Sequence, residues 1–501
     1  MTQRRNVRRK KVSRTSRKIG LVLCGIQLFL TIGFATVLLQ LNILPAGRLV
    51  PILCALVVLL LCSFVTQGMT RGKARAGKIL SVLVSVLLVF GVYWGYQGDG
   101  TLRALSGDGR TITIDNVVVV VLDSDPAESL QDAVDYVFGV QYTMRGEAVR
   151  TAVEELNDEL GVTIREWEYA SLLEQVDGLR YGEVQAIIYN EAFRDLLAEH
   201  RPGFLEEVRV IGSRQIVREE ENIIDVEEID VSDDTFFVFI SGMDVFGAIE
   251  TSGLSDVNML MAVNPDTHQI LLINTPRDYY VPFPGITGAR NDKLTHAGIY
   301  GVHASMAALS ELYGIDIPFY VRVNFTSFID IIDALGGIDV YSAHRFATSG
   351  YPALQVSQGM NRFDGRQALA FTRERFNVPG GDIGRGANQQ AVISGILRRA
   401  MSPAILTGAG GILSGVEAGM DTNMTHEQIQ ALIRDQLRLG SSWNMKSVGV
   451  DGTHGHSTEC FSMPGVSLFV IRPDMEQVNG AREQIAALQR GEIFADTEVL
   501  E

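Results

Sequence analysis

Three long apolar runs near the N-terminus are the feature that most restricts how this chain folds. They cover Leu21–Leu41, Val50–Met69 and Ile79–Tyr96, and none of them contains a charged residue. Each run is close to the roughly 20 residues that an α-helix needs to cross a bilayer. The sequence therefore predicts three transmembrane helices, with a cleaved signal peptide as the alternative for the first run.

The distribution of charge predicts the orientation of these helices. No acidic residue occurs before Asp99, whereas 14 of the 43 basic residues do. Nine of the 14 lie in the first 18 residues and four lie between residues 70 and 78. Because loops rich in lysine and arginine stay in the cytoplasm, we expect a cytoplasmic N-terminus and a second loop on the same side. Three crossings then place everything after Tyr96 outside, as in a multi-pass cell-membrane protein with an extracytoplasmic body.

The body that follows the helices is strongly acidic. It contains 29 basic and 59 acidic residues, so its formal net charge is −30. A body of this charge is a poor partner for the phosphates of a nucleic acid, and none is expected as a partner. Cys460 is the single cysteine after the apolar runs, which excludes an intrachain disulfide there.

Periodicity divides the chain into four parts, and their elements predict an α/β protein. A basic tail with the three helices occupies residues 1–98, and an extracytoplasmic accessory α/β domain occupies residues 102–230. In the accessory domain, Thr111–Leu122 reads as a buried strand and Leu130–Phe138 as a helix. A catalytic domain is expected over residues 235–472, followed by a C-terminal tail helix at 473–501. The first strands expected in the catalytic domain are Phe236–Ile240, Asn258–Val263 and Gln269–Asn274.

An arginine-rich stretch around a Pro-Gly-Gly turn is the strongest chemical signal. Arg373 and Arg375 are two residues apart, so on a strand both would point to one face. Arg385 and Gln389 are four apart, so on a helix both would share a face. Asp382 follows two glycines, where the N-cap of that helix would lie. This pattern predicts a pocket for a polyanion, and a solvated charged loop is the alternative.

Carboxylates and basic residues also follow or precede several predicted strands. Asp244 follows the first strand of the catalytic domain, Asp256 precedes the second and Arg277 follows the third. If these strands are neighbours, the three side chains lie at one end of a sheet; as isolated residues, the acids could equally be turn or N-cap residues. Two carboxylates beside several arginines suit a pyrophosphate bridged by Mg²⁺, which prefers hard oxygen ligands. Lys293 precedes a predicted helix in the same region.

Several short motifs together resemble one known family. This part of the chain is similar to the LytR–CpsA–Psr family of cell-envelope glycopolymer transferases, and the three apolar runs with the accessory domain resemble its capsule-linked CpsA-type members. The motifs occur in order between residues 242 and 389: Gly-Met-Asp, Ser-Asp-Val-Asn, Thr-Pro-Arg-Asp-Tyr, Asp-Lys-Leu-Thr-His-Ala, Asn-Phe-Thr-Ser-Phe, Ala-Leu-Gly-Gly-Ile-Asp-Val, Phe-Asp-Gly-Arg-Gln-Ala-Leu and Arg-Glu-Arg…Gly-Gly-Asp-x-x-Arg-x-x-x-Gln.

The resemblance implies a fold and an activity. The fold would be an α/β/α sandwich with a mixed central sheet and an apolar cavity for a polyprenyl tail. The activity would be a phosphotransfer that moves a glycopolymer, here a capsular polysaccharide, from polyprenyl pyrophosphate to peptidoglycan through a phosphodiester. Partners would be the lipid-linked polymer, peptidoglycan, the membrane and capsule assembly proteins. A polyprenyl-pyrophosphate sugar pyrophosphatase and a non-catalytic polymer-binding or assembly protein are the alternatives.

The resemblance also implies roles for individual residues. Mg²⁺, or Mn²⁺ in its place, would be bound by Asp244 and Asp256. Asp382 would orient arginines or assist proton transfer and, with Arg277 and Arg375, would be catalytic. One position departs from the family pattern, because Leu254 stands where an arginine is common. The residues expected to bind the pyrophosphate are Arg277, Arg373, Arg375, Arg385, Gln389 and Lys293.

Overall fold

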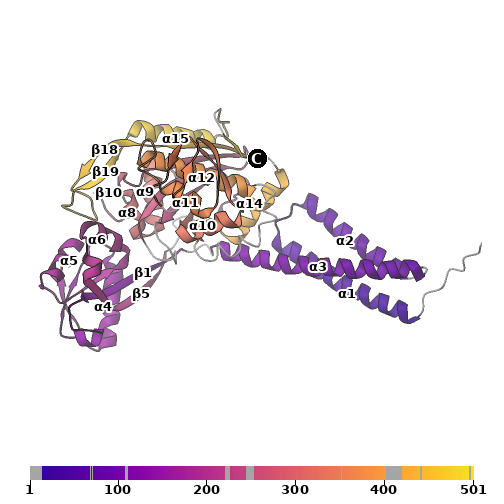
Figure 1. The fold of residues 1–501 in the computed structure, drawn as a ribbon, viewed down its shortest axis with the longest axis horizontal. Helices are drawn as coiled ribbons and strands as arrows, with labels where there is room; N and C mark the ends of the chain where they lie inside the picture. Colours follow the sequence, from indigo (N-terminus) through magenta and orange to yellow (C-terminus); the bar gives the residue numbers. More distant parts are fainter. Residues whose placement is uncertain are drawn as a thin grey trace, which may run out of the picture. The chain divides into compact units, whose positions relative to one another are not determined.

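The chain divides into two compact units, Met1–Ala104 with His426–Ser441, and Leu105–Thr425 with Ser442–Glu501. Figure 1 shows the course of the chain through its helices and strands. The computed structural model describes residues 14–67, 69, 71–107, 111–220, 226–243, 253–350, 353–401, 420–440, 443–495 and 498–500.

The first unit consists of three long apolar helices and one short one. All three long helices have the length and composition of membrane-spanning segments, which confirms the helices predicted from the apolar runs. Polar contacts also join them, since Ser81 Oγ donates to the carbonyl of Leu23 at 3.2 Å. The helices are α1 (Arg14–Leu41), α2 (Ala46–Gln67), α3 (Arg71–Leu105) and α14 (His426–Leu439).

The accessory domain is built on a five-stranded sheet in the order β3-β2-β4-β1-β5. Successive valines of β1 point to opposite faces, as the period of a strand requires. Val117, Val119 and Val121 pack with α4, while Val118 and Val120 pack with α5 and α6. The elements are β1 (Thr111–Leu122), β2 (Val137–Val140), β3 (Arg165–Glu168), β4 (Ala186–Asn190), β5 (Val208–Glu220), α4 (Gly146–Leu160), α5 (Leu172–Arg180), α6 (Arg194–His200) and α7 (Phe204–Glu207).

One predicted helix of the accessory domain is wrong. The segment Leu130–Phe138 forms a single 3₁₀ turn, Leu130–Ala133, and then enters β2. β2 pairs in parallel with both β3 and β4, so its backbone hydrogen bonds go to neighbouring strands. Pairing between distant segments therefore overrides the helical spacing of the apolar residues, which is a weak local preference.

The catalytic domain is an α/β/α sandwich around a mixed sheet, as expected. The sheet has seven strands in the order β16-β11-β6-β7-β8-β17-β20. β11 runs parallel to β6 and β17 parallel to β8, and the other neighbours are antiparallel. The strands are β6 (Phe236–Met243), β7 (Ser255–Asn264), β8 (Gln269–Thr275), β11 (Phe319–Asn324), β16 (Met420–Thr422), β17 (Trp443–Gly449) and β20 (Glu498–Leu500).

Helices cover both faces of this sheet (Figure 1). α9 (Val302–Tyr313) and α15 (Met475–Gln489) pack on the face that carries Phe239 and Leu260. α12 (Asp382–Met401) crosses the other face, where Gln390 Nε2 donates to the carbonyls of Leu272 and Val448. α10 (Phe325–Ala334) and α11 (Gly365–Arg373) share an apolar cluster with α12.

The C-terminal segment is part of the same sandwich. Val478, Ala481, Ile485 and Leu488 of α15 are buried in the cluster that covers the sheet. β20 adds the last strand of the sheet by pairing with β17. The boundary drawn at residue 472 from the sequence therefore does not separate two structural layers.

Strand register brings two of the predicted site residues together. β7 and β8 are antiparallel, with Asn258 opposite Thr275. Extending that register by two residues beyond the end of β8 sets Asp256 opposite Arg277. Both side chains consequently lie at one end of the sheet, as the sequence predicted for neighbouring strands. Asp244, the third residue predicted at this end, lies outside the described residues.

Close packing of α11 on α10 requires a glycine at position 365. A Cβ there would lie 2.3 Å from the carbonyl oxygen of Ile329, far inside van der Waals contact. We expect Gly365→Ala to destabilise the full-length protein by about 1–3 kcal/mol, because the backbone of α10 or α11 must move to make room for the added Cβ. Gly480→Ala is the matched control, since an added Cβ on α15 meets open space and alanine favours a helix by about 0.5–1 kcal/mol. Thermal unfolding of both variants in detergent measures the difference, and equal melting temperatures would contradict this packing.

Candidate active site

A cavity of about 440 Å³ opens at the end of the sheet that carries Asp256. Its walls come from β6, β7 and β11 on one side and from α10, α11 and α12 on the other. Apolar side chains line its interior, including Ile240, Val323, Phe328 and Ile393. The polar residues that line it include six of those predicted from the sequence: Asp256, Arg277, Arg373, Arg375, Arg385 and Gln389.

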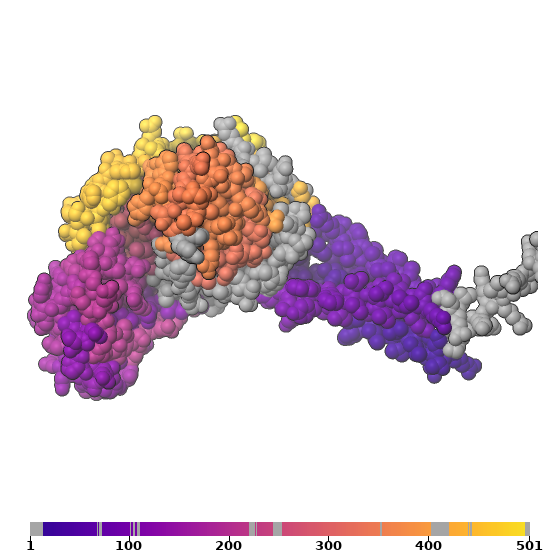
Figure 2. Space-filling model, in the orientation of Figure 1, coloured from indigo at the N-terminus to yellow at the C-terminus, as the bar shows by residue number. Residues whose placement is uncertain are grey.

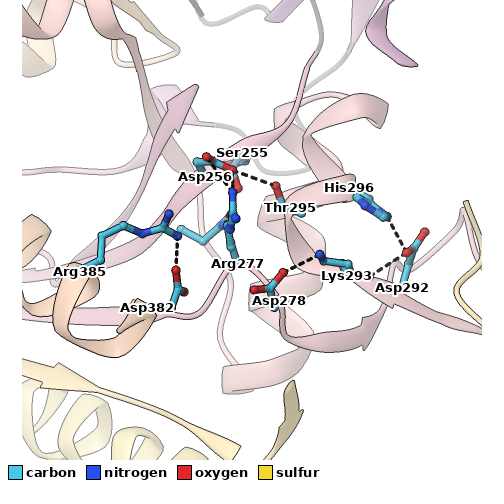
Figure 3. A network of polar contacts seen from close by, with 11 residues as sticks. Ser255, Asp256, Arg277, Asp278, Asp292, Lys293, Thr295, His296, Asp382 and Arg385 are labelled. Atoms are coloured by element: carbon cyan, nitrogen blue, oxygen red, sulfur yellow. Dashed lines mark hydrogen bonds and ion pairs between the residues drawn. The ribbon is translucent and has the colours of Figure 1, made fainter. Parts of the chain in front are cut away.

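Arg277 and Asp256 form an ion pair at the centre of the polar group (Figure 3). Nη1 of Arg277 donates to both carboxylate oxygens of Asp256, at 2.9 and 3.0 Å. Burial alone would lower the pKa of Arg277, but the negative charges of Asp256 and Asp278 outweigh it and hold that pKa above its usual range. Nε of Arg277 is buried and has no hydrogen-bond partner within the described part of the chain.

Arg385 carries less compensated charge than Arg277. It lies one helical turn after Asp382, the first residue of α12, and Nη2 is 2.6 Å from the Asp382 carboxylate. Burial lowers the pKa of Arg385, Asp382 opposes this effect, and the positive charge of Arg277 adds to it. Nε of Arg385 is also buried without a hydrogen-bond partner among the residues described. An anion in the cavity would supply the missing charge and acceptors, and the N-terminus of α12 favours one further.

The turn before α12 differs slightly from the sequence expectation. Gly380 and Gly381 both have positive φ, 86° and 60°, which explains the two glycines. α12 begins at Asp382, so this residue lies in the first turn of the helix. Arg385 and Gln389 share one face of α12 and both line the cavity, as their spacing predicted. Asp382 contacts Arg385, which is compatible with an orienting role.

Arg373 and Arg375 are not on a strand, so that prediction is wrong. Arg373 is the last residue of α11, and the chain after it is extended. A capping box starts this helix, because Asp364 accepts from the backbone of Gln367 and the Gln367 side chain accepts in return. Both arginines still reach the cavity. Their guanidinium carbons lie over aromatic rings, 4.4 Å from Phe325 for Arg373 and 4.9 Å from Phe376 for Arg375.

Glu374 is a site residue that the sequence reasoning did not single out. It lies between the two arginines, is only 2% exposed, and accepts hydrogen bonds from the backbone and hydroxyl of Ser349 and from the backbones of Phe376 and Asn377. Burial would raise the pKa of Glu374, but these hydrogen bonds outweigh it and lower that pKa. Glu374 thereby holds the loop that carries Arg375. The sequence signal that could have identified Glu374 is its position between two arginines that were predicted to belong to the site.

Lys293 lies outside the cavity lining. Its Nζ is 2.7 Å from a carboxylate oxygen of Asp278, and Figure 3 shows this pair on the opposite side of Arg277 from Asp382. Next to it, the Asp292 carboxylate contacts Nδ1 of His296 at 2.7 Å and accepts from the backbone of Ser462. These contacts give Lys293 a partner within the protein, and the structure does not bring it to the arginine group.

The predicted metal pair is described only in part, since Asp244 lies outside the described residues. Asp256 is an oxygen donor at the cavity, and both of its oxygens accept from Arg277. The described residues contain no group of three His, Cys, Asp or Glu side chains that could hold a metal ion. Mg²⁺ often takes only one or two carboxylates, so the oxygen donor of Asp256 is compatible with it.

Residues 211–479 match the LytR_cpsA_psr family. The chain belongs to this family. A Bacillus anthracis protein named polyisoprenyl-teichoic acid–peptidoglycan teichoic acid transferase TagU is 33% identical over 216 residues, which are 43% of this chain and 69% of that protein. A protein of the same name from Oceanobacillus iheyensis is 31% identical over 240 residues, covering 46% and 70%. A crystal structure of B. subtilis TagV aligns over 52% of this chain and 98% of its own, with 20% identity and a TM-score of 0.44.

Loss of the Arg385 guanidinium should weaken anion binding in the cavity. We expect Arg385→Ala to reduce the affinity for farnesyl pyrophosphate, a short polyprenyl pyrophosphate, by about 10- to 100-fold, because a charged hydrogen bond contributes about 1.5–3 kcal/mol. Isothermal titration calorimetry on the full-length protein measures this affinity. Arg362→Ala is the control, since Arg362 is exposed and pairs with Asp339 away from the cavity. Equal losses in both variants would remove Arg385 from the anion site.

The hydrogen bonds to Glu374 should make its contribution to stability depend on pH. Its folded-state pKa is lowered, so the stabilisation is present above the unfolded-state pKa and is lost as pH falls through the folded-state pKa. At pH 7 we expect Glu374→Gln to lower the free energy of unfolding by about 1–3 kcal/mol. Urea unfolding measured from pH 7 down to about pH 3, which is below the usual glutamate pKa of about 4.3, should show the gap between variant and wild type narrowing. A gap that is constant with pH would contradict this assignment.

Proposed function

We propose that this protein transfers a glycopolymer from a polyprenyl pyrophosphate lipid to peptidoglycan, forming a phosphodiester. The observation that carries the proposal is the cavity itself: an apolar interior whose rim holds Arg277, Arg373, Arg375 and Arg385. An isoprenoid tail needs an apolar wall, and a pyrophosphate needs several fixed cations. The relatives named as transferases of polyisoprenyl-linked teichoic acid support the same assignment.

The arginines account for most of the chemistry that such a transfer needs. A hydroxyl of the acceptor sugar attacks the sugar-side phosphorus and gives up its proton to water as the new P–O bond forms. The bond to the lipid phosphate breaks, and polyprenyl phosphate leaves. Charge that builds up on the leaving phosphate is neutralised by guanidinium groups that are already in place. Because a phosphate leaves readily, positioning and charge neutralisation matter more than a strong acid. The loop held by Glu374 keeps Arg375 in position for this task.

We also propose that Mg²⁺, with Mn²⁺ as the alternative, binds at this site. Asp256 is the described residue that would hold it, and Asp244 is proposed as its second ligand from the sequence alone. The ion would add positive charge beside the phosphate oxygens. Support comes from the oxygen donor at the cavity and from the preference of Mg²⁺ for carboxylates together with phosphates.

The polymer and the membrane orientation are part of the same proposal. Three apolar helices and an accessory domain resemble the layout of capsule-linked family members, so we propose a capsular polysaccharide and capsule assembly partners. Teichoic acid, named for the relatives, is the competing polymer. The basic tail and second loop support a cytoplasmic N-terminus. The active site would then face the side on which lipid-linked polymer and peptidoglycan meet.

A reconstituted reaction tests the proposed function. Full-length protein in detergent is incubated with a radiolabelled polyprenyl-pyrophosphoryl oligosaccharide, Mg²⁺ and peptidoglycan oligomers. We expect label in a sugar-phosphate-peptidoglycan product and release of polyprenyl phosphate. Asp256→Asn should lower the rate about 10²- to 10³-fold, because it removes the carboxylate that orients Arg277. Asp339→Asn, an exposed acid paired with Arg362, is the control.

The products distinguish the alternatives to this function. Free sugar phosphate in place of the linked product would indicate a pyrophosphatase, in which water takes the acceptor role. Tight binding of the lipid with no turnover would indicate a carrier or assembly protein.

A further inference from the structure

The accessory domain and the catalytic domain share an apolar core. Four side chains of the shared cluster are at most 7% exposed: Leu196 and Leu197 of α6, and Ile299 and Phe461 of the catalytic domain. Figure 2 shows the magenta surface of the accessory domain meeting the yellow C-terminal part of the catalytic domain. Burial of apolar side chains from both domains against each other limits their independent motion.

One arginine of the accessory domain reaches across this contact. Arg145 is the N-cap residue of α4, and its Nη2 is 2.8 Å from the Asp115 carboxylate. Both side chains are buried, at 2% and 0% exposure. Nη1 of Arg145 donates to the backbone carbonyl of Ile299 in the catalytic domain. Because a buried guanidinium is costly unless its donors are satisfied, this hydrogen bond resists separation of the two domains there.

The backbone of Arg145 is strained. Its φ is 50° and its ψ is 33°, which is the left-handed region that residues other than glycine seldom adopt. The other described non-glycine residues with positive φ are Asn42 and His268, and both residue types tolerate this conformation better than arginine. Such a conformation persists only where its surroundings hold it, as the contacts with Asp115 and Ile299 do.

The segment that contains Ile299 packs on the chain that leads into Asp256. α8 (Leu294–Ala297) is followed at once by a 3₁₀ turn, Gly298–Tyr300. A Cβ on Gly298 would lie 2.4 Å from the carbonyl oxygen of Gly253 and 2.9 Å from the backbone nitrogen of Ser255. The two backbones are therefore in direct contact just before Asp256, so displacement of the 3₁₀ turn would displace the start of β7.

α8 itself contacts both members of the central ion pair. The backbone nitrogen of Thr295 donates to the carbonyl of Arg277 at 2.8 Å, and that of Leu294 donates to the carbonyl of Tyr279 at 2.8 Å. The Thr295 hydroxyl reaches the Asp256 carboxylate at 3.4 Å (Figure 3). A shift of α8 would consequently move the backbone of Arg277 and remove a contact of Asp256.

The start of the segment is fixed within the catalytic domain. The Asp292 carboxylate accepts from the backbone of Ser462 and lies 2.7 Å from Nδ1 of His296 (Figure 3). At the end of the segment, the side chain that reaches the carbonyl of Ile299 comes from the accessory domain instead. The two domains thus hold α8 from opposite ends.

We propose that Arg145 is a positioning residue for the candidate active site, through which the accessory domain holds α8, Arg277 and Asp256 in the arrangement that binds the pyrophosphate. Arg145 does not belong to the described lining of the cavity, so it acts through Ile299 and α8. This inference rests on the proposed function for the identity of the ligand. It gives the accessory domain a part in forming the active site.

Preorganisation is the physical basis of this role. An arginine that is already fixed binds an anion more tightly than a mobile one, because binding does not have to order it. Loss of the Arg145 guanidinium frees one end of α8 and leaves the accessory domain otherwise intact. Asp115 would keep Arg218 and the amide of Asn190 as partners, so no buried carboxylate loses all its partners.

Amide hydrogen exchange of the full-length protein in detergent tests the inference without a ligand. Arg145→Met removes the guanidinium and keeps an unbranched side chain. We expect the amides of Leu294 and Thr295 to exchange about 10-fold faster in this variant, because their hydrogen bonds open when α8 is less firmly held. The amides of α12 should exchange as in wild type.

Arg150→Met is the matched control. Arg150 is an exposed arginine on α4, and its guanidinium carbon lies 4.0 Å from the ring centroid of Tyr142 within the accessory domain. We expect wild-type exchange at α8 in this variant. Arg145→Lys keeps a positive charge beside Asp115 without the fork of the guanidinium, so its effects should be in the same direction and smaller. It supplies the same measurements if Arg145→Met does not fold.

Titration with farnesyl pyrophosphate measures the consequence for the site. We expect Arg145→Met to weaken the affinity about 3- to 10-fold, because Arg277 must then be ordered on binding. In an Arg277→Ala background the same change should cause no further loss, since the residue that it positions is gone. In an Arg385→Ala background the loss should remain, because α12 carries Arg385.

The outcomes separate this inference from the proposed function. Wild-type exchange at Leu294 and Thr295 in Arg145→Met would overturn the inference, and so would equal losses of affinity with and without Arg277. Faster exchange and weaker binding in a protein that forms no phosphodiester would leave the inference standing and refute the proposed function.

Discussion

The pairing of Arg277 with Asp256 is the interaction on which the candidate site depends. It follows from the antiparallel register of β7 and β8, which sets the two residues opposite each other just beyond the hydrogen-bonded ladder. The pair then fixes one guanidinium at the rim of the apolar cavity. Thr295 of α8 contacts the same carboxylate, so the helix that follows the third strand is tied to the sheet end as well.

The positive charges of Arg277 and Arg385 are neutralised to different degrees by the residues around them. Arg277 is surrounded by carboxylates and its pKa is raised, whereas burial and neighbouring cations lower the pKa of Arg385. The buried Nε atoms of Arg277 and Arg385 have no hydrogen-bond partner among the described residues. An unpaired buried donor is costly, so a protein that retains two of them at one cavity is suited to receive an anion there. The apolar interior behind them indicates that the anion is attached to a hydrophobic chain.

The accessory domain is tied to the same end of the sheet. Arg145 of this domain donates to the carbonyl of Ile299, which is four residues after Thr295, and Leu254 packs against an apolar cluster that both domains share. Leu254 illustrates why a departure from a family pattern is best judged in three dimensions. The arginine expected there from the resemblance would project a charge into an apolar cluster shared by two domains.

Local patterns in the sequence determined the membrane helices, the α/β alternation, the first three strands of the catalytic domain and most residues of the arginine group. These features depend on the length of an apolar run, on the spacing of apolar residues and on residue type, all of which can be read from residues close together in the sequence. Local spacing misplaced Arg373 and Arg375 on a strand and Leu130–Phe138 in a helix, because a capping box and strand pairing decided those segments. Only the tertiary structure joined Glu374 to Ser349 and Gln390 to Leu272. Those contacts link residues that are far apart in the chain, so no local periodicity of the sequence predicts them.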